Sequence, residues 1–410
     1  MLFFLDLQEI ITYSDDMELK TIITDDVKTL FQIFDNQIRL VGGCVRDYLL
    51  GQACQDYDLA TPLLPQDVID RLQRHNIPVF LTGARYGTVT AVYHGTSYEI
   101  TTLRTDDNQD GRHASVRFVS QYQQDAQRRD FTINALYMDC LGDIQDYTNG
   151  LSDLEKKCVR FIGHPIQRVR EDFLRILRYF RFVAYLGTHH IDNVSLQACR
   201  DECGGLKNIS VERIQAEMKR LLMAPHVIQA LALMHQAGVL AVLIPQYHIN
   251  RLADFIHIYP QADFLQRLSV LTDNPLALNW KWSCSQKKQI QQYLLPVRIT
   301  MDDIQNKYLL WQLGWDGFLF HVYQAVLNCR LSLCEVQNMY RWTMPVFPVT
   351  GHDVYQLGFR GKEIADQLKI AENLWVKIGL PCEKKLVINA LLRYNEQKTN
   401  NGKDVKNAKM

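Results

Sequence analysis

The chain has 410 residues, 47% of them hydrophobic, and its formal net charge is zero. This length predicts two to four domains with enough apolar side chains for their cores. The balanced charge excludes a protein coated with positive charge for nucleic acids and leaves local basic patches for phosphates. The longest apolar runs fall short of the roughly 20 residues that span a membrane, so we expect no membrane contact.

The cysteines and the first residues bear on the compartment. The ten cysteines are scattered, and no two of them have the CxxC spacing of a zinc knuckle. Free thiols are typical of the reducing cytoplasm, which is the expected location. Residues 1–11 are apolar but lack the basic region of a secretory signal, and Met17 is an alternative start.

The first 150 residues alternate β-rich runs with helical stretches. The runs 38–41, 88–93 and 98–103 favour strands, whereas 66–74 has a helical spacing of apolar residues. This part is predicted to be an α/β or α+β domain with a small sheet.

A strand predicted over 38–41 runs into Gly42 and Gly43 at the start of a helix. Glycine lets the backbone approach a phosphate closely, and a helix N-terminus favours anions. Arg46, which follows in the same helix, could grip a triphosphate. Taken alone, two glycines before a helix are better explained by an ordinary tight turn.

Asp56 and Asp58 are two positions apart, which in a strand places both carboxylates on one face, about 7 Å apart. Hard oxygen ligands suit Mg²⁺, which could join both carboxylates to substrate phosphates. The alternative is a solvated strand end. By itself, an Asp-x-Asp pair favours this alternative.

Residues 38–61 resemble the signature of the DNA polymerase β-type nucleotidyltransferase superfamily, in the form shared by class II CCA-adding enzymes and bacterial poly(A) polymerases. The resemblance implies that Asp56 and Asp58 hold two catalytic Mg²⁺ ions. Residues 128–135 resemble the RRD motif of this family, which implies that Arg129 and Asp130 engage the nucleotide ribose. An aspartate can accept from a 2′-OH while an arginine donates. An arginine–aspartate pair on the surface is the alternative.

Residues 170–182 resemble the EDxxR motif of the same family and the arginines that follow it. On one helix, Asp172 and Arg175 would share a face and present an acceptor beside a planar donor, as the Watson–Crick partner of a base does. Arg175, Arg178 and Arg181 form a row at a spacing of three. The resemblance implies that these residues contact the incoming nucleotide, and the alternative is a solvated basic stripe beside a core.

Two segments bear on the substrate. The polar run 104–114 resembles the flexible loop of CCA-adding enzymes at full length, and 82–89 resembles the version in CCA-adding enzymes rather than in poly(A) polymerases. Glu99 could be a third carboxylate near the metals. An outward position on an alternating strand is the preferred interpretation, so Glu99 is not among the predicted site residues.

From residue 151 onward, apolar residues recur at spacings of three and four, so the remainder is predicted to be helical. Ser210 is expected to cap a helix over 211–222, which resembles the family's motif that braces the neck. The overall fold class is therefore α+β. The predicted division is a catalytic head (1–150), a neck that recognises the base (151–225), a body (226–345), a tail (346–395) and a disordered end (396–410).

The resemblance implies template-independent addition of C, C and A from CTP and ATP to the 3′ end of tRNA, with release of pyrophosphate. The neck, body and tail would hold the acceptor arm. The alternatives are poly(A) addition, CC-only or A-only addition, and a non-enzymatic RNA-binding relative. The presence of Asp56, Asp58, Asp172 and Arg175 speaks against the last of these.

Overall fold

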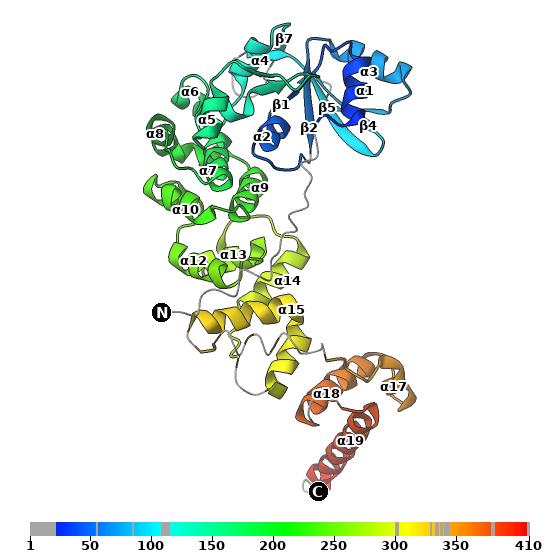
Figure 1. Ribbon diagram of the computed structural model, residues 1–410. Coiled ribbons are helices and arrows are strands. Elements are labelled where there is room, and N and C mark those ends of the chain that lie inside the picture. The colour runs from blue at the N-terminus through cyan, green and yellow to red at the C-terminus, as the bar shows by residue number, and fades with distance from the viewer. Residues whose placement is uncertain are drawn as a thin grey trace. The chain divides into compact units, whose positions relative to one another are not determined.

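The structure is a computed structural model (Figure 1). It describes residues 22–54, 56–83, 86–107, 115–299, 303–328, 330–332, 336, 339, 345–378 and 382–407. The chain divides into two compact units, Met1–Pro245 and Gln246–Met410. In the described residues, every helix is too short or too polar to cross a lipid bilayer.

A mixed sheet is the centre of the first unit. Among the described residues, seven strands pair in the order β3-β4-β5-β2-β1-β8-β9. Only β2 and β5 are parallel in that sheet, and the other described pairs are antiparallel. The bounds are β1 Arg39–Val41, β2 Tyr57–Thr61, β3 Val79–Gly83, β4 Thr88–Tyr93, β5 Thr96–Thr102, β8 Leu136–Met138 and β9 Ile144–Asp146. With the helical remainder, this sheet confirms the predicted α+β class.

Short helices connect the strands of the head. Their bounds are α1 Asp25–Ile33, α2 Gly43–Leu49, α3 Pro65–Arg74, α4 Tyr122–Arg128, the 3₁₀ turn η2 Thr132–Asn134, and α5 Gly150–Glu155. The chain leaves β1 through Gly42, whose φ of +79° is accessible to glycine and costly for other residues. This turn lets α2 pack beside β1 and β2 (Figure 1).

The polar run 104–114 is not wholly a loop. Its first residues form β6 (Arg104–Asp107), which pairs with β7 (Ser115–Phe118) as a separate two-stranded hairpin. Backbone pairing satisfies N–H and C=O groups whatever the polarity of the side chains, so a polar sequence does not exclude a strand. Residues 108–114 of the predicted loop lie outside the described residues.

Helices follow the head, with bounds α6 Pro165–Glu171, α7 Leu174–Leu186, α8 Asn193–Asp201, the 3₁₀ helix η3 Cys203–Asn208, α9 Val211–Leu222, α10 Val227–Gln236 and α11 Val239–Leu243. The predicted helix over 211–222 is confirmed, although the side chain of Ser210 makes no capping hydrogen bond. The central helix α7 buries Ile176, Leu177 and Phe180 and packs against both α9 and α10. The first compact unit continues to Pro245, past the predicted end of the neck at residue 225. The division into head, neck, body and tail remains a prediction.

All the regular elements that the structure describes in the second unit are helices, joined by irregular segments such as 345–350. Its elements are α12 Ile249–Ile258, α13 Phe264–Leu271, the 3₁₀ turn η4 Pro275–Ala277, α14 Cys284–Tyr293, α15 Asp303–Leu327, α17 Gly351–Gln356, α18 Lys362–Ile378 and α19 Lys384–Asn407. The fully buried Trp375 centres a cluster that also contains Val387 and Leu391. Helix α19 runs to Asn407, and the predicted disorder from residue 396 remains a prediction.

Candidate active site

Asp58 lies on β2 near the middle of the sheet. The parallel pairing of β2 with β5 places Glu99 directly beside it, and Asp56 precedes the strand as an exposed residue. Burial raises the pKa of Asp58 from 3.8 to about 6, and the charges of Glu99 and Asp56 act in the same direction. Arg129 and Arg46 oppose this increase without cancelling it. The strand therefore holds a carboxylate whose negative charge is incompletely compensated by the protein.

Glu99 is a candidate site residue that the sequence analysis left out. Its side chain is exposed, as the alternation of β5 predicted, but the register brings it next to Asp58. The predicted outward position of Glu99 is therefore correct. That position was not a reason to exclude Glu99 from the site. Strand register joins residues that are distant in sequence, and alternation within one strand carries no information about it.

The turn after β1 lies close to the carboxylate of Asp58 and to the guanidinium of Arg129. A Cβ atom built on Gly42 would lie 3.5 Å from Nη1 of Arg129 and 3.9 Å from Oδ2 of Asp58. A Cβ on Gly43 would lie 3.8 Å from Nη2 of Arg46. Both predicted glycines thus lie against predicted site residues, and the bare backbone of Gly42 leaves room beside Asp58.

Arg46 is enclosed rather than open to solvent, with 8% of its surface exposed. Its Nε donates to Oδ1 of Asp47 at 2.9 Å, and its Nη1 donates to Oδ1 of Asn134 at 2.6 Å. The guanidinium also lies 5.0 Å from the ring centre of Phe182 on α7. Arg46 therefore joins α2, η2 and α7, and its contact with a triphosphate remains a prediction.

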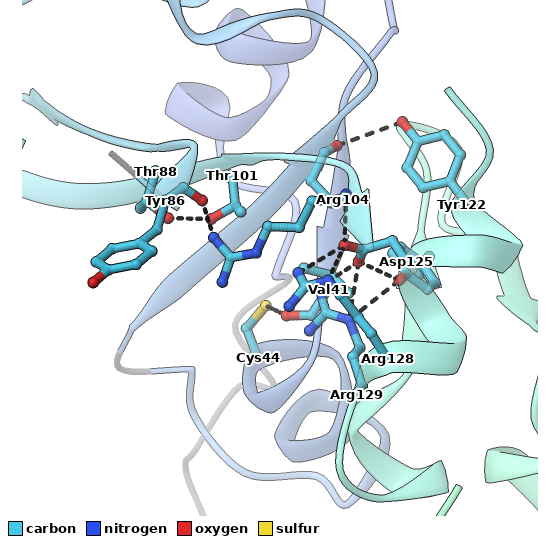
Figure 2. A network of polar contacts seen from close by, with 12 residues as sticks. Val41, Cys44, Tyr86, Thr88, Thr101, Arg104, Tyr122, Asp125, Arg128 and Arg129 are labelled. Carbon is cyan, nitrogen blue, oxygen red and sulfur yellow. Dashed lines mark hydrogen bonds and ion pairs between the residues drawn. The ribbon is translucent and has the colours of Figure 1, made fainter. Parts of the chain in front are cut away.

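Arg129 and Asp130 are neighbours in sequence that bind different partners. Nη2 of Arg129 donates to Oδ2 of Asp125 at 3.0 Å, as Figure 2 shows. Oδ2 of Asp130 accepts from Nε of Arg178 on α7 at 2.6 Å. Burial opposes the ionisation of Asp130, but Arg178, Asn134 and Arg175 together outweigh burial and lower the pKa of that carboxyl. Asp130 is thus an anion at neutral pH, able to accept a hydrogen bond from a hydroxyl.

Asp172 and Arg175 do not lie on one helix, so that prediction is wrong. Helix α6 ends at Glu171 and α7 begins at Leu174, and Asp172 between them is extended at φ −154°. Its Oδ1 accepts from the backbone N–H of Leu174 at 3.1 Å. An aspartate that binds a nearby backbone N–H competes with helix continuation, which explains the break.

The two members of the predicted base-reading pair are bound elsewhere in this structure. Oδ2 of Asp172 accepts from Nη2 of Arg213 on α9 at 2.7 Å. Arg175 donates to Glu171 and to the backbone oxygen of Arg168. The sequence did not predict that Arg213, 41 residues away, would be the partner of Asp172. To bind a base, Asp172 would have to release Arg213, and Arg175 would have to release Glu171 or the backbone of Arg168.

The row of arginines on α7 is held by carboxylates of other elements. Arg178 pairs with Asp130, and Nε of Arg181 donates to Oε2 of Glu217 on α9 at 2.7 Å. The side chains of Arg175, Arg178 and Arg181 are 15%, 32% and 17% exposed. A solvated basic stripe is therefore excluded. Glu217 is 4% exposed and was not found from the sequence, because the pairing depends on how α7 and α9 pack.

Asp58 on β2 and Asp56 just before it are the predicted ligands of Mg²⁺. In the part of the chain that the structure describes, no group of three His, Cys, Asp or Glu is arranged as metal ligands. Mg²⁺ in phosphate-transferring sites commonly uses one or two carboxylates and takes its other ligands from water and substrate phosphates. Asp56 and Asp58 fit that mode. A cation would stabilise the charged form of Asp58, which burial and the charges of Glu99 and Asp56 disfavour.

Comparison with known proteins identifies the family. Residues 38–160 match the family described as "Poly A polymerase head domain", and residues 190–249 match "Probable RNA and SrmB- binding site of polymerase A". The chain is 33% identical over 398 residues to the mitochondrial CCA tRNA nucleotidyltransferase 1 of Mus musculus, and the match covers 90% of each chain. It is 34% identical over 373 residues to the CCA-adding enzyme of Oceanobacillus iheyensis, a match that covers 85% of this chain and 91% of that one.

A solved structure agrees with these relatives. The crystal structure of the Bacillus stearothermophilus CCA-adding enzyme in complex with CTP is similar at a TM-score of 0.70 and 27% sequence identity. The similarity covers 91% of this chain and 98% of that one. Sequence and fold thus match over nearly the whole length, including the helical parts that carried no motif. The chain belongs to the family of CCA-adding tRNA nucleotidyltransferases.

Proposed function

We propose that this protein adds C, C and A to the 3′ end of tRNA from CTP and ATP, without a template and with release of pyrophosphate. The observation that carries this proposal is the 33% identity to a CCA tRNA nucleotidyltransferase over 90% of both chains. The meeting of Asp58, Gly42 and Arg129 supports it, because a nucleotidyl transfer needs a carboxylate that can hold a metal ion close to a donor for phosphate oxygens.

In this proposal each group at the turn has one task. Asp56 and Asp58 would hold Mg²⁺, which would supply activation of the tRNA 3′-OH and neutralisation of phosphate charge. Gly42 leaves space for phosphate oxygens, and the guanidinium of Arg129 donates to the nucleotide beside them. Asp130 accepts from a ribose hydroxyl. The 3′ oxygen attacks the α-phosphorus, the bond to the β-phosphate oxygen breaks, and pyrophosphate leaves without a covalent enzyme intermediate.

We further propose that Asp172 and Arg175 recognise the base, with Arg178 and Arg181 behind them. Replacing Asp172 or Arg175 with alanine is expected to lower the preference for CTP and ATP over UTP and GTP by roughly 10- to 100-fold, because hydrogen bonds to the base edge are lost. The measurement is kcat/KM for each nucleotide on a defined tRNA end.

Arg170 offers a matched control for this selectivity. It lies on α6 with 64% of its side chain exposed and pairs with Glu202. Arg170→Ala removes an arginine from the same segment and should leave base preference unchanged. If Asp172→Ala and Arg175→Ala keep the preference as well, the base is read by other residues.

The space at Gly42 gives a second prediction with a natural control. Gly42 and Gly51 have φ of +79° and +72°, so alanine at either position carries similar backbone strain. A Cβ at Gly51 meets nothing within 4 Å, whereas one at Gly42 points at Arg129 and Asp58. We expect both Gly→Ala variants to lose about 1 kcal/mol of stability. Only Gly42→Ala should reduce CMP incorporation, by about tenfold. Equal loss of activity in both variants would contradict the assignment.

Poly(A) addition is the second candidate, because residues 38–160 match a poly(A) polymerase head domain. The deciding experiment sequences the products made on tRNAs that end before C, after C, after CC and after CCA, with each nucleotide triphosphate. A CCA-adding enzyme completes the first three and stops at the fourth. Runs of A on the fourth tRNA would favour poly(A) addition, CC or A alone would indicate a partial activity, and no release of pyrophosphate would indicate a non-enzymatic relative.

The tRNA acceptor arm is the proposed partner of the helical parts, because residues 190–249 match a probable RNA-binding region. The proposed location is the cytoplasm, since Cys44, Cys158 and Cys199 are buried as free thiols, as expected in a reducing compartment. The mouse relative is named as mitochondrial, so the mitochondrial matrix is the alternative. Cell fractionation followed by detection of the native protein distinguishes the two.

A further inference from the structure

Asp125 on α4 is the most heavily bonded carboxylate around the site, with 1% of its surface exposed. Its Oδ1 accepts from Nε of Arg128 at 2.8 Å and from the backbone N–H of Arg104 at 3.3 Å. Its Oδ2 accepts from the hydroxyl of Tyr137 at 2.7 Å and from Nη2 of Arg129 at 3.0 Å. Figure 2 shows Asp125 beside Arg104, Arg128 and Arg129, with dashed lines that mark their contacts.

We propose that Asp125 is a positioning residue that aims Arg129 at the nucleotide and joins this arginine to the β6–β7 hairpin. The inference deepens the proposed function, since it rests on the proposed contact of Arg129 with the nucleotide. Asp125 itself does not touch the reacting groups.

The aim of Arg129 follows from which of its nitrogens are occupied. Nε lies 3.2 Å from Oδ2 of Asp125 and 3.2 Å from the hydroxyl of Tyr137, and Nη2 bonds the same Asp125 oxygen. These contacts take one edge of the planar guanidinium. Nη1 is the nitrogen that faces Gly42, 3.5 Å from where a Cβ would be. Because the guanidinium is rigid, holding one edge fixes the direction of the other.

The charge of Asp125 is what makes this hold strong. Burial opposes its ionisation, but Arg129, Arg128 and the hydroxyl of Tyr137 together outweigh burial and lower the pKa of the carboxyl below its usual range. Hydrogen bonds between two charged groups are shorter and stronger than those between neutral groups. An asparagine at this position would keep the shape of the side chain but leave Arg129 without its buried counter-charge.

The same carboxylate reaches the hairpin through the backbone. The N–H of Arg104, the first residue of β6, bonds Oδ1 of Asp125, and Leu103 before it donates to the oxygen of Thr61 at the end of β2. The side chain of Arg104 donates to the backbone oxygen of Tyr86. Asp125 therefore holds both the first residue of the hairpin and one edge of the Arg129 guanidinium. A displacement of the hairpin would move Arg129 through Asp125, and the reverse.

The test compares Asp125→Asn, Arg129→Met and the double variant in the full-length protein. KM and kcat are measured for CTP and ATP on a defined tRNA. Asp125→Asn is expected to raise KM for both nucleotides about tenfold, while kcat at saturation stays within about threefold. Because Asp125 acts through Arg129, adding Asp125→Asn to Arg129→Met should raise KM no further. Hydrogen exchange should show the amide of Arg104 less protected in Asp125→Asn.

Controls separate positioning from loss of structure. Asp153 is a 5% exposed aspartate that pairs with Arg160 and accepts from Thr132, so Asp153→Asn also removes a buried charge. It should lower stability and leave KM unchanged. If Asp125→Asn does not fold, Tyr137→Phe removes one donor to Asp125 and one partner of Arg129, and a KM increase of about two- to threefold is expected.

The outcomes distinguish this inference from the proposed function. If Arg129→Met leaves KM unchanged, the proposed role of Arg129 is wrong. If Arg129→Met raises KM but Asp125→Asn and Tyr137→Phe do not, Arg129 binds the nucleotide without help from Asp125, and the inference alone is overturned. Independent, multiplying effects of the two substitutions on KM would overturn the inference in the same way.

Discussion

Replacing Asp56 and Asp58 together with alanine is expected to reduce incorporation of CMP and AMP into tRNA lacking its CCA end by at least about 1000-fold. Without the two carboxylates, the space beside Gly42 cannot hold a divalent cation against the phosphates. The attacking oxygen would then remain a neutral hydroxyl, and the charge on pyrophosphate would not be offset as it leaves. The measurement is single-turnover incorporation at saturating nucleotide, so that weaker binding does not hide the effect on chemistry.

A matched control removes the same number of charges from the same unit. Asp67 and Asp70 lie on α3, where Asp70 accepts from Gln66 at 2.8 Å. The double replacement Asp67→Ala with Asp70→Ala should keep incorporation within about twofold, since surface substitutions away from a site have small effects. Near-normal incorporation by the Asp56 and Asp58 variant would show that the metal site has been assigned to the wrong residues.

The local features of the site could be predicted because they depend on neighbours in sequence. The order of strand, glycine turn and helix places Gly42 before α2. The spacing of two predicted a strand through both aspartates, but only Asp58 lies on β2, and Asp56 lies just before it. The same reasoning located α3 and α9, whose apolar residues recur at the helical period. A local pattern of this kind is written within a few turns of chain and needs no knowledge of the tertiary fold.

The partners of these residues could not be predicted because they come from distant elements. Asp130 binds Arg178, 48 residues away, and Arg181 binds Glu217, 36 residues away. These pairs form because of how α7 packs against the head and against α9. The spacing of residues within a helix does not predict that packing. The break at Asp172 has a local cause, but the spacing to Arg175 does not reveal it. Asp172 is three residues from Arg175 whether it lies between two helices or inside one.

The position of Asp58 predicts a cost in stability that comes with its function. In the absence of divalent cations, Asp58→Asn is expected to stabilise the first unit at pH 7.5 by up to about 3 kcal/mol, the free energy that corresponds to a pKa raised from 3.8 to about 6. The folded state binds the proton of Asp58 more tightly than the unfolded state does. This contribution to stability is complete below pH 3.8 and is lost as the pH rises through about 6. Above that pH the folded protein carries a buried anion, whereas asparagine carries none.

The stability measurement must follow the unfolding of the first unit alone. All six tryptophans lie at or after position 280, in the second unit, so tryptophan fluorescence would follow the wrong part of the chain. Hydrogen exchange of the β2 and β5 amides is the suitable measurement, at pH values from 4 to 7.5 and corrected for the intrinsic exchange rate. The exposed Asp56 provides the control, because Asp56→Asn should change protection little.

Two further results connect this stability to the site. In a Glu99→Gln background the gain from Asp58→Asn should be smaller, since the neighbouring charge contributes to the raised pKa of Asp58. Mg²⁺ with CTP should stabilise the wild-type unit but not the Asp58→Asn variant, because a ligand that binds only the folded state shifts the equilibrium toward it. A gain from Asp58→Asn that is equal at pH 4 and pH 7.5 would mean that its cause is packing rather than charge. The incompletely compensated charge of Asp58 would then not support the proposal of a cation site on this strand.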